Sequence, residues 1–281
     1  NIKLVVAHVN HMIRAVADSE TEFVKGFCED NGVDCFVKRI DVVGLSEKLK
    51  ISCEEAGRNV RYDFFDEIFD KVGANKIAIA HNKNDNVETV LMNIMRGSGV
   101  SGLKGIEPVR DGKFIRPLIE IDRKSIEQYC VDENLNPKFD ESNKENVYTR
   151  NKVRNLLIPY IEKEFNPNII ESISRLSDLA TQESNFVDNV VDKEFKNTLI
   201  SYNESEIKLD LKKFNNLDSF IKAKIILKSV AKLFYTTKGI EKVHIEDVIK
   251  LCERNIGNKY LTPNRNLKFF IKKGVITISK V

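Results

Sequence analysis

Residues 76–96 read KIAIAHNKNDNVETVLMNIMR, an apolar run that leads through a polar turn into a helical pattern. The run Lys76–Ala80 has the length and composition of a buried strand. From Asp85 onward the apolar residues recur at helical spacing and form one stripe, while Asp85 and Glu88 share the face turned away from it. A strand that leads directly into such a helix is the repeating unit of α/β proteins with a parallel sheet.

The same alternation of strand and helix precedes this stretch. The expected elements are strands at 3–9 and 34–40 and helices at 19–31 and 52–72. Each helix opens on a serine with a glutamate three residues later, Ser19 with Glu22 and Ser52 with Glu55, which is the spacing of a capping box. The expected fold class is therefore α/β, with a parallel sheet whose ligands bind at the carboxyl ends of its strands.

From about Asn168 the pattern changes to mainly helical periodicity. Helices are expected at about 168–195, 214–235 and 245–254, and strands at 267–271 and 275–278. We place the domain boundary near Asn166-Pro167. Residues 1–166 then form the α/β domain, and residues 167–281 form a linker helix with a smaller, mostly helical C-terminal domain.

Composition excludes several classes of protein. The chain has 281 residues, 42% hydrophobic and 31% charged, which is enough apolar material for two globular domains. No run approaches the roughly 18 apolar residues of a membrane span, so no membrane partner is expected. The five cysteines are scattered without a C-x-x-C pair, which favours reduced thiols and a cytoplasmic location over a disulfide scaffold or a zinc site. The H-E-x-x-H and G-x-S-x-G motifs of two hydrolase classes are absent.

The charge is distributed unevenly along the chain. Residues 193–281 hold 19 Lys and Arg against 9 Asp and Glu, a net charge of +10, whereas residues 1–192 have a net charge of −7. A basic C-terminal third predicts a polyanionic partner, with the chemistry in the front part of the chain. A solvated lysine-rich surface explains the same asymmetry equally well.

Two helices carry candidate functional side chains. Asp85 and Glu88, three residues apart on the face turned from the core, suit Mg²⁺ or an ammonium group. Acidic residues in a first helical turn also stabilise the helix dipole, which is the structural alternative. Arg58 and Arg61 share one face of the helix at 52–72 and suit phosphate groups, although an ion pair on a solvated helix would use the same spacing.

Two polar segments follow. Arg96-Gly97-Ser98-Gly99 is a glycine-rich stretch whose backbone N–H groups suit an anion, although a helix C-cap also explains Gly97. The segment from Asp140 to Arg154 is rich in Asn, Arg and Tyr and contains no glycine. Such a composition suits contacts to a nucleotide, and a capped helix start would use the same residue types.

Taken in order, these segments resemble the tRNA(Ile)-lysidine synthases of the PP-loop ATP pyrophosphatase superfamily. The resemblance extends over about residues 8–154 and is carried by seven motifs in the family's order. The motifs are His8-Val9-Asn10-His11-x-x-Arg14, Glu54-Glu55-Ala56-Gly57-Arg58 with Arg61-Tyr62, Ala80-His81-Asn82-x-x-Asp85-x-x-Glu88-Thr89, Arg96-Gly97-Ser98-Gly99-x-x-Gly102-Leu103, Arg116-Pro117-Leu118, Asp140-x-Ser142-Asn143 and Tyr148-x-Arg150-Asn151-x-x-Arg154.

The resemblance implies a ligase reaction in two steps. ATP adenylates the C2 oxygen of the wobble cytidine in tRNA(Ile) with a CAU anticodon, and pyrophosphate is released. The ε-amine of free L-lysine then attacks C2 and expels AMP, which leaves lysidine. ATP and Mg²⁺ are the implied cofactors, because charge on the phosphates must be stabilised in both steps.

The resemblance also implies roles for individual residues. The expected catalytic residues are Asp85, Glu88, His81 and Arg58, with Asp85 and Glu88 holding lysine or Mg²⁺. The expected nucleotide-binding residues are His8, Asn10, Arg96 and Gly97. The expected tRNA-binding residues are Arg61, Arg116, Asp140, Asn143, Tyr148, Arg150, Asn151 and Arg154.

The chain departs from the family pattern at its start. The S-G-G-x-D-S loop that wraps pyrophosphate in this superfamily is not in the sequence, and it is expected just before the first strand. The resemblance therefore implies a chain truncated at its N-terminus, with a sheet that lacks a central strand and without activity by itself. Residues 167–281 are similar to the family's first C-terminal domain, and the resemblance implies that this is a tRNA-binding domain. The second C-terminal domain of longer members is not in the sequence.

Two other functions stay open at this point. A related PP-loop tRNA thiolase would need catalytic cysteines, which typically form C-x-x-C pairs. A non-catalytic RNA-binding remnant would fit the basic C-terminal third. The oligomeric state is also open, with a homodimer as one possibility.

Overall fold

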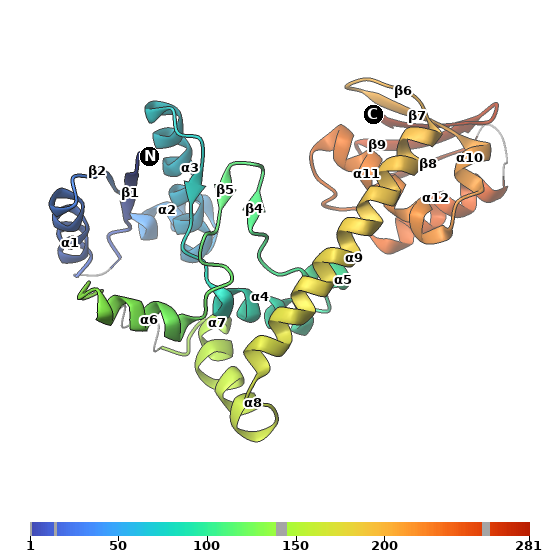
Figure 1. Cartoon of the computed structure of the whole chain (residues 1–281). Coiled ribbons are helices and arrows are strands. Elements are labelled where there is room, and N and C mark those ends of the chain that lie inside the picture. The colour runs from blue at the N-terminus through green and yellow to red at the C-terminus, as the bar shows by residue number, and fades with distance from the viewer. Residues whose placement is uncertain (1, 14–15, 139–144, 255–258) are drawn as a thin grey trace. The chain divides into compact units, whose positions relative to one another are not determined.

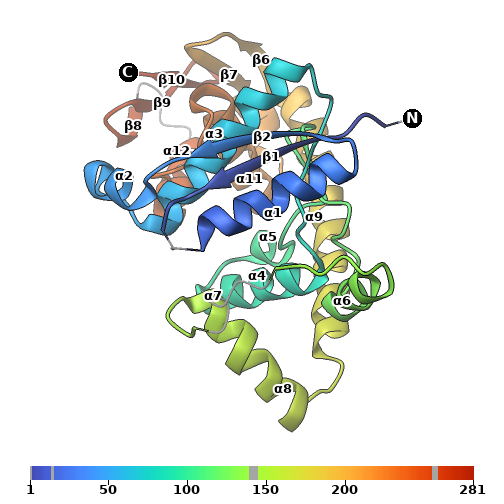
Figure 2. The ribbon, with the colours of Figure 1, turned by 90° about the vertical axis from the view of Figure 1, so that its left-hand side faces the viewer.

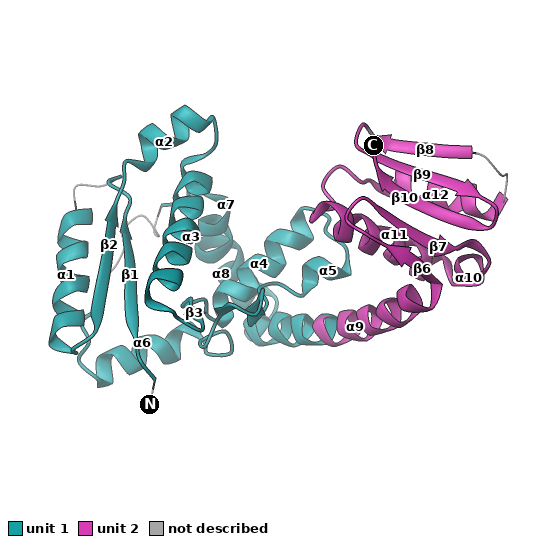
Figure 3. Ribbon diagram, turned by 90° about the horizontal axis from the view of Figure 1, so that it is seen from above, with its two compact units in different colours: residues 1–180 teal, residues 181–281 magenta. Residues whose placement is uncertain are grey.

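The computed structural model describes residues 2–13, 16–138, 145–254 and 259–281. The chain divides into two compact units, residues 1–180 and residues 181–281, each of which is described by itself (Figures 1 and 3).

Unit 1 opens with a strand–helix–strand crossover. Strands β1 (Val5–Asn10) and β2 (Asp34–Arg39) pair in parallel, with Val5 opposite Asp34. Helix α1 (Ala17–Asp30) connects them and lies along the pair in both views (Figures 1 and 2). This confirms the predicted parallel pairing of the first two strands.

The next two helices begin at side-chain caps. Asp41 caps α2 (Val42–Leu49), a helix that the sequence pattern did not predict. The Ser52 side chain accepts a hydrogen bond from the backbone N–H of Glu55 and caps α3 (Cys53–Val72), which ends at Gly73 with φ +64°. The matching prediction for Ser19 was wrong, because α1 already begins at Ala17 and the Ser19 hydroxyl donates to the carbonyl of Val16.

The central strand–helix unit is present, with a short strand. β3 (Ile77–Ala78) pairs in parallel with β5 (Phe114–Ile115), and β4 (Val109–Arg110) adds to β5 in antiparallel orientation. Helices α4 (Lys83–Met95) and α5 (Val100–Leu103) lie between β3 and β4 in sequence. The described strands of unit 1 therefore form two small sheets, β1-β2 and β3-β5-β4.

The rest of unit 1 is helical. Its elements are α6 (Arg123–Asp132), α7 (Thr149–Lys152), the π-helical turn Val153–Leu157, α8 (Ile158–Glu164) and the long α9 (Ile169–Thr198). A core forms where these helices meet α4, from Val87, Val90, Val153, Ile158 and Ile173. The amphipathic pattern first seen at 85–96 thus anchors the helical half of the unit.

Unit 2 contains a five-stranded antiparallel sheet in the order β6-β7-β10-β9-β8. Its strands are β6 (Leu199–Tyr202), β7 (Glu206–Asp210), β8 (Lys259–Asn264), β9 (Leu267–Lys272) and β10 (Val275–Lys280). Its helices are α10 (Leu211–Asn215), α11 (Ser219–Phe234) and α12 (Lys242–Arg254). Alternate residues of β7, β9 and β10 are buried in a core with these helices. The sequence pattern predicted β9 and β10 but not β6, β7 or β8.

The division between the units lies inside α9. It falls at residues 180 and 181 rather than near Asn166-Pro167. The reason is that α9 supplies side chains to two cores, Ile173 to the core of unit 1 and Val191 and Phe195 to that of unit 2. Among the residues described, no helix is both long and apolar enough to cross a lipid bilayer.

Candidate active site

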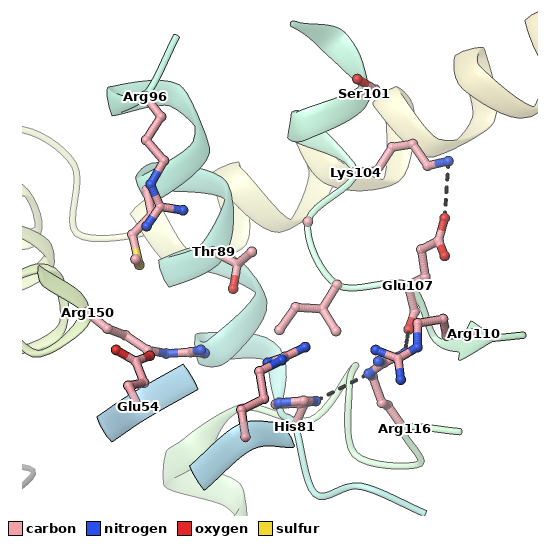
Figure 4. A pocket seen from close by; sticks show the side chains of 14 residues that line it. Glu54, His81, Thr89, Arg96, Ser101, Lys104, Glu107, Arg110, Arg116 and Arg150 are labelled. Carbon is pink, nitrogen blue, oxygen red and sulfur yellow. Dashed lines mark hydrogen bonds and ion pairs between the residues drawn. The ribbon is translucent and has the colours of Figure 1, made fainter. Parts of the chain in front are cut away.

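A cavity of about 460 Å³ opens in unit 1 (Figure 4). Its volume lies within the usual range for small-molecule sites. Its lining consists of Glu54, Arg58, His81, Thr89, Met92, Arg96, Ser101, Lys104, Gly105, Ile106, Glu107, Arg110, Arg116 and Arg150. Six of these side chains are cationic and two are acidic, so the cavity is suited to an anion.

The first turn of α4 is held by a capping box beside this cavity. The Asn82 side chain accepts from the backbone N–H of Asp85 at 3.0 Å, and Oδ2 of Asp85 accepts from the backbone N–H of Asn82 at 3.0 Å. Asp85 therefore does stabilise the start of α4, which was the structural alternative for this residue, and it does so through Oδ2. Its second oxygen is left for other groups.

Two arginines bind the acidic pair of α4. Nε of Arg150 donates to Glu88 at 2.8 Å, and a terminal nitrogen of Arg150 donates to Oδ1 of Asp85 at 3.1 Å. Nε of Arg154 donates to Glu88 at 2.6 Å, and its terminal nitrogen donates to Oδ1 of Asp85 at 3.0 Å. Glu88 is only 1% exposed, so this buried carboxylate is compensated by two guanidinium groups.

A π-helical turn adjoins these arginines in sequence. Arg150 belongs to α7, and Arg154 lies in the turn Val153–Leu157 that follows. Such turns are uncommon and are often found at functional sites. Both guanidinium groups reach the same carboxylates, and Arg150 also lines the cavity. The ion-pair cluster of Asp85, Glu88, Arg150 and Arg154 therefore adjoins the cavity.

His81 follows β3 and contacts the cavity's buried arginine. Nε of Arg116 donates to Nδ1 of His81 at 3.2 Å, and Arg116 also donates to the backbone carbonyl of Glu107. Because Nδ1 accepts this bond, the ring proton is assigned to Nε2. Burial lowers the pKa of His81, the charges of Arg116, Arg150 and Arg58 lower it further, and Asp85 opposes them. His81 is therefore a neutral hydrogen-bond donor.

Aromatic rings support two further arginines of the cavity. The Arg110 guanidinium lies 4.7 Å from the Tyr62 ring centroid and 4.4 Å from that of Phe114. The Arg58 guanidinium lies 5.0 Å from the same Tyr62 ring. These cation–π contacts restrict the two guanidinium groups while their edges stay available for hydrogen bonds.

A buried amide fixes the loop that forms another wall of the cavity. Oδ1 of Asn86 accepts from the backbone N–H of Ile106 at 2.7 Å, and its Nδ2 donates to the Ser177 hydroxyl at 3.2 Å. The Ser177 hydroxyl in turn donates to the carbonyl of Lys104 at 2.9 Å. The loop is thus tied to α4 and α9, and Gly105 between these bonds has φ +63°.

The structure brings many of the predicted site residues together. Arg58, His81, Arg96, Arg116 and Arg150 line the cavity. Asp85, Glu88 and Arg154 adjoin it through the ion-pair cluster. The chemistry expected of these residues stays a prediction.

Other predicted site residues lie outside the cavity lining. His8 bonds to Thr21, and the amide of Asn10 donates to Ala17, Asp18 and Thr21, so both residues join β1 to α1. Four more lie elsewhere, namely Arg61 beside His11, the exposed Gly97, the exposed Tyr148 and Asn151, whose amide donates to the carbonyl of Glu145. Asp140 and Asn143 fall outside the described residues.

Several cavity residues were not predicted from the sequence. Arg110, Lys104 and Glu107 lie in a two-residue strand and in loops, where no periodic pattern marks a functional side chain. Glu54 and Thr89 belong to two of the motifs that carry the family resemblance, but no role was predicted for either. Only the structure shows that both line the cavity. The glycines near Lys104 were the one local indication of a tightly packed loop.

The fit of a magnesium ion to Asp85 and Glu88 depends on what already surrounds them. One oxygen of Asp85 closes the capping box, and the other three carboxylate oxygens accept guanidinium N–H groups. Over the described parts of the chain, no three His, Cys, Asp or Glu side chains are grouped to hold a metal. This arrangement leaves no carboxylate oxygen free and does not fit a protein-held Mg²⁺.

Comparison with known proteins places the chain in a family. The model of the PP-loop domain family matches residues 1–161. The tRNA(Ile)-lysidine synthase of Clostridium acetobutylicum is 43% identical over 99% of this chain and 60% of that protein. The tRNA(Ile)-lysidine synthase of Clostridioides difficile is 40% identical over 99% of this chain and 61% of that protein. The chain thus spans about three fifths of the length of these relatives.

A solved structure supports the same fold. The U34-tRNA thiolase NcsA from Methanococcus maripaludis, with its [4Fe-4S] cluster, matches with a TM-score of 0.51 at 20% sequence identity. The match covers 64% of this chain and 63% of the thiolase chain, and at this identity it bears on the fold alone. With a family match over more than half of its length, and with tRNA(Ile)-lysidine synthases similar to nearly all of it, the chain belongs to the PP-loop domain family.

Proposed function

We propose that the protein ligates L-lysine to C2 of the wobble cytidine of tRNA(Ile) with a CAU anticodon, with ATP as the co-substrate. The single observation that carries the proposal is the cationic cavity that adjoins Asp85, which is partly buried, and Glu88, which is fully buried. The cavity suits phosphate groups, and the acidic pair would suit an ammonium group where Arg150 or Arg154 moves aside. The ligation needs both. The similarity to tRNA(Ile)-lysidine synthases supports this choice among PP-loop chemistries.

In the first step the C2 oxygen of cytidine attacks the α-phosphorus of ATP. The bond from that phosphorus to the bridging oxygen breaks, and pyrophosphate leaves with the electron pair. Negative charge grows on the phosphate oxygens, and Arg58, Arg110 and Arg116 would stabilise it from a partly buried wall. His81 would add a neutral N–H donor at Nε2 without changing its protonation state.

In the second step the ε-amine of lysine attacks C2, the bond from C2 to the adenylated oxygen breaks, and AMP leaves with that oxygen. The attacking ε-amine is uncharged, and it releases a proton to water as the new C–N bond forms. Glu88 and Asp85 would hold an ammonium group of lysine, which requires Arg150 or Arg154 to release part of the carboxylate surface. Because Arg150 lines the cavity, its guanidinium group would then turn from the carboxylates toward the phosphates.

The thiolase alternative lacks support in the same cavity. No cysteine is among the residues that line it, and no two cysteines form a C-x-x-C pair. All five cysteines, Cys28, Cys35, Cys53, Cys130 and Cys252, are free thiols. Burial raises the pKa of Cys35 to about 11 and that of Cys252 to about 12, which disfavours the nucleophilic thiolate at neutral pH.

The test is ATP-dependent incorporation of labelled lysine into a tRNA transcript with a CAU anticodon. The protein is expressed from its complete reading frame, beside the 281-residue chain, and a transcript with a GAU anticodon serves as control. We expect incorporation into the first transcript only and release of one AMP and one pyrophosphate for each lysine. Absence of incorporation with the complete protein would overturn the proposal, and sulfur transfer instead would establish the thiolase.

A substitution in the acidic pair separates lysine handling from RNA binding. Glu88→Gln should lower lysine incorporation by at least about 100-fold, since a developing charge loses its partner in a buried site. The affinity for the tRNA should change by less than about threefold, because Glu88 is not exposed to a macromolecule. Glu171→Gln, in an exposed pair with Lys83, is the matched control. Equal loss of RNA affinity and incorporation would make Glu88 a structural residue.

A further inference from the structure

Tyr62 is not among the residues that line the cavity of unit 1, but two arginines that do line it lie against its ring. The guanidinium carbon of Arg58 is 5.0 Å from the ring centroid, and that of Arg110 is 4.7 Å from it. Arg58 comes one helical turn before Tyr62 in α3, whereas Arg110 belongs to β4, which is distant in sequence. One ring is therefore shared by two cations from different walls of the cavity.

The two arginines have few other restraints. Within the described residues, no ion pair and no hydrogen bond of the Arg58 side chain is found. Arg110 forms an ion pair of 3.2 Å with its neighbour Asp111, whose side chain is 75% exposed, and so exposed a pair contributes little. The second contact of Arg110 is again aromatic, at 4.4 Å from the ring centroid of Phe114. Aromatic rings are therefore the main restraint on both guanidinium groups.

The ring of Tyr62 is itself held in place by two other rings. Its centroid lies 5.2 Å from that of the buried Phe114, at an interplanar angle of 73°, and 6.2 Å from that of Phe65, at 71°. Both are edge-to-face contacts, which aromatic pairs favour. Over the described parts of the chain, the Tyr62 hydroxyl has no hydrogen-bond partner. Tyr62 therefore acts on its surroundings through its ring and not through its polar atom.

A shared ring solves an electrostatic problem of this cavity. Six cationic side chains line it against two acidic ones, so its arginines repel one another and, if unrestrained, would turn toward water. The negative face of an aromatic ring attracts a guanidinium group without occupying the N–H groups at its edge. The Tyr62 ring can therefore hold Arg58 and Arg110 close together while both keep donors for an anion.

We propose that Tyr62 is a positioning residue, which holds Arg58 and Arg110 in one arrangement so that both bind the phosphate groups of ATP. The proposal rests on the proposed function, in which these arginines stabilise phosphate oxygens, and it adds the group that sets their relative position. Arginines ordered before ATP binds lose less conformational freedom when it does, which increases affinity. They also need no rearrangement as negative charge grows on the phosphates.

The test compares three single variants of the protein expressed from its complete reading frame. Tyr62→Phe keeps the ring and removes the hydroxyl, whereas Tyr62→Leu keeps an apolar side chain and removes the ring. The matched control is Phe36→Leu, which removes a ring of unit 1 that lies 4.7 Å from the ammonium group of Lys71 and does not line the cavity. Affinity for ATP is measured by isothermal titration calorimetry. Urea unfolding checks that each variant is folded, and Tyr62→Met replaces the leucine variant if that one is not.

We expect Tyr62→Leu to bind ATP at least about tenfold more weakly, because two cation–π contacts that order the arginines are lost. Tyr62→Phe and the Phe36→Leu control should each change the affinity by less than about threefold. An unchanged affinity of Tyr62→Leu would overturn the proposal. So would equal losses in Tyr62→Phe and Tyr62→Leu, since these would assign the effect to the hydroxyl.

A second background separates positioning from general support of the fold. When Arg58→Gln and Arg110→Gln are combined, no guanidinium group is left for the ring to hold. Adding Tyr62→Leu to this double variant should then change the affinity for ATP by less than about twofold, because the effects of residues that act as one unit are not additive. A loss as large as in the unmodified background would make Tyr62 a structural residue and reject the positioning role.

The calorimetric measurement needs neither tRNA nor lysine, so its outcome is independent of the proposed ligation. If the complete protein incorporates no lysine while Tyr62→Leu still loses affinity for ATP, the ligation fails and the positioning role stands. Where lysine is incorporated, Tyr62→Leu should lower kcat at saturating ATP and leave the KM for lysine within about threefold. A higher KM for lysine at unchanged kcat would place the effect of Tyr62 at the lysine site and refute the proposal.

Discussion

Gly105 shows how a single residue shapes the cavity. Its φ of +63° is unfavourable for side chains, and a Cβ there would collide with Oδ1 of Asn86. We expect Gly105→Ala to lower the free energy of unfolding by about 2 kcal/mol or more, measured by urea denaturation. Gly26→Ala is the control, because Gly26 lies inside α1 with nothing within 4 Å of its Cβ position. That change should raise stability by up to about 1 kcal/mol, and equal effects would refute the packing argument.

The histidines of unit 1 make its stability depend on pH. Burial lowers the pKa values of His8, His11 and His81 in the folded chain below the ordinary 6.5. The unfolded chain therefore binds more protons as the pH falls through about 6.5, which means that acid favours unfolding. We expect the unfolding free energy to decrease from about pH 7.5 to about pH 5.5.

The measurement is urea denaturation in a single buffer series over that range, with the His81→Gln variant beside the unmodified chain. The variant lacks one of the three titrating groups, so its stability should fall less steeply with acid. A constant or rising stability toward the acid end of the range would show that these side chains are protonated in the folded state.

At the scale of elements, two serines with the same local sequence pattern have different roles. Ser52 caps α3, whereas Ser19 lies inside α1 and bonds back to Val16. Ser52→Ala should lower the unfolding free energy by about 1 kcal/mol. Ser19→Ala should change it by less than about 0.5 kcal/mol. Thermal or urea unfolding of both variants measures the difference, and equal losses would show that the pattern matters more than the observed helix start.

The elements that the sequence predicted share strong local signals. β1, β2, α3 and α4 combine apolar periodicity with glycine stops or caps, and all four are present. β6 and β8 show no such alternation and are stabilised by pairing with the strands that follow them, β7 and β9. β7 does alternate apolar and polar residues, but over only five positions, and its pairing with β10 joins strands that are distant in sequence. The two-residue strands of unit 1 are likewise products of tertiary structure.

The candidate site residues also divide into those that a local sequence motif marks and those that only the structure reveals. Arg58, His81, Asp85 and Glu88 stand in motifs, and the structure places them in or beside one cavity. The motif at 148–154 did not indicate that its arginines bind the acidic pair, since that contact joins residues more than 60 positions apart. Arg110 had no local signal in the sequence, and its place in the cavity lining, against the rings of Tyr62 and Phe114, comes from the structure.

At the scale of the whole molecule, one helix contributes to two cores. Ile173 packs in unit 1 and Phe195 in unit 2, although both belong to α9. We expect Ile173→Ala to cost about 2–4 kcal/mol and Phe195→Ala about 3–5 kcal/mol. Hydrogen exchange should increase mainly in residues 1–180 for the first variant and mainly in residues 181–281 for the second. Increased exchange throughout the chain in either case would show that the units unfold together.

The capping box at the start of α4 has a consequence for the evolution of this protein. Asp85 uses one oxygen to close the helix start and the other to receive two guanidinium groups. Asparagine would offer a single oxygen, and glutamate is one methylene too long for the same closure. Position 82 is less constrained, because serine or threonine can accept the same backbone N–H. Selection should therefore permit drift at position 82 while it fixes position 85, because one side chain provides both the helix cap and a carboxylate of the ion-pair cluster.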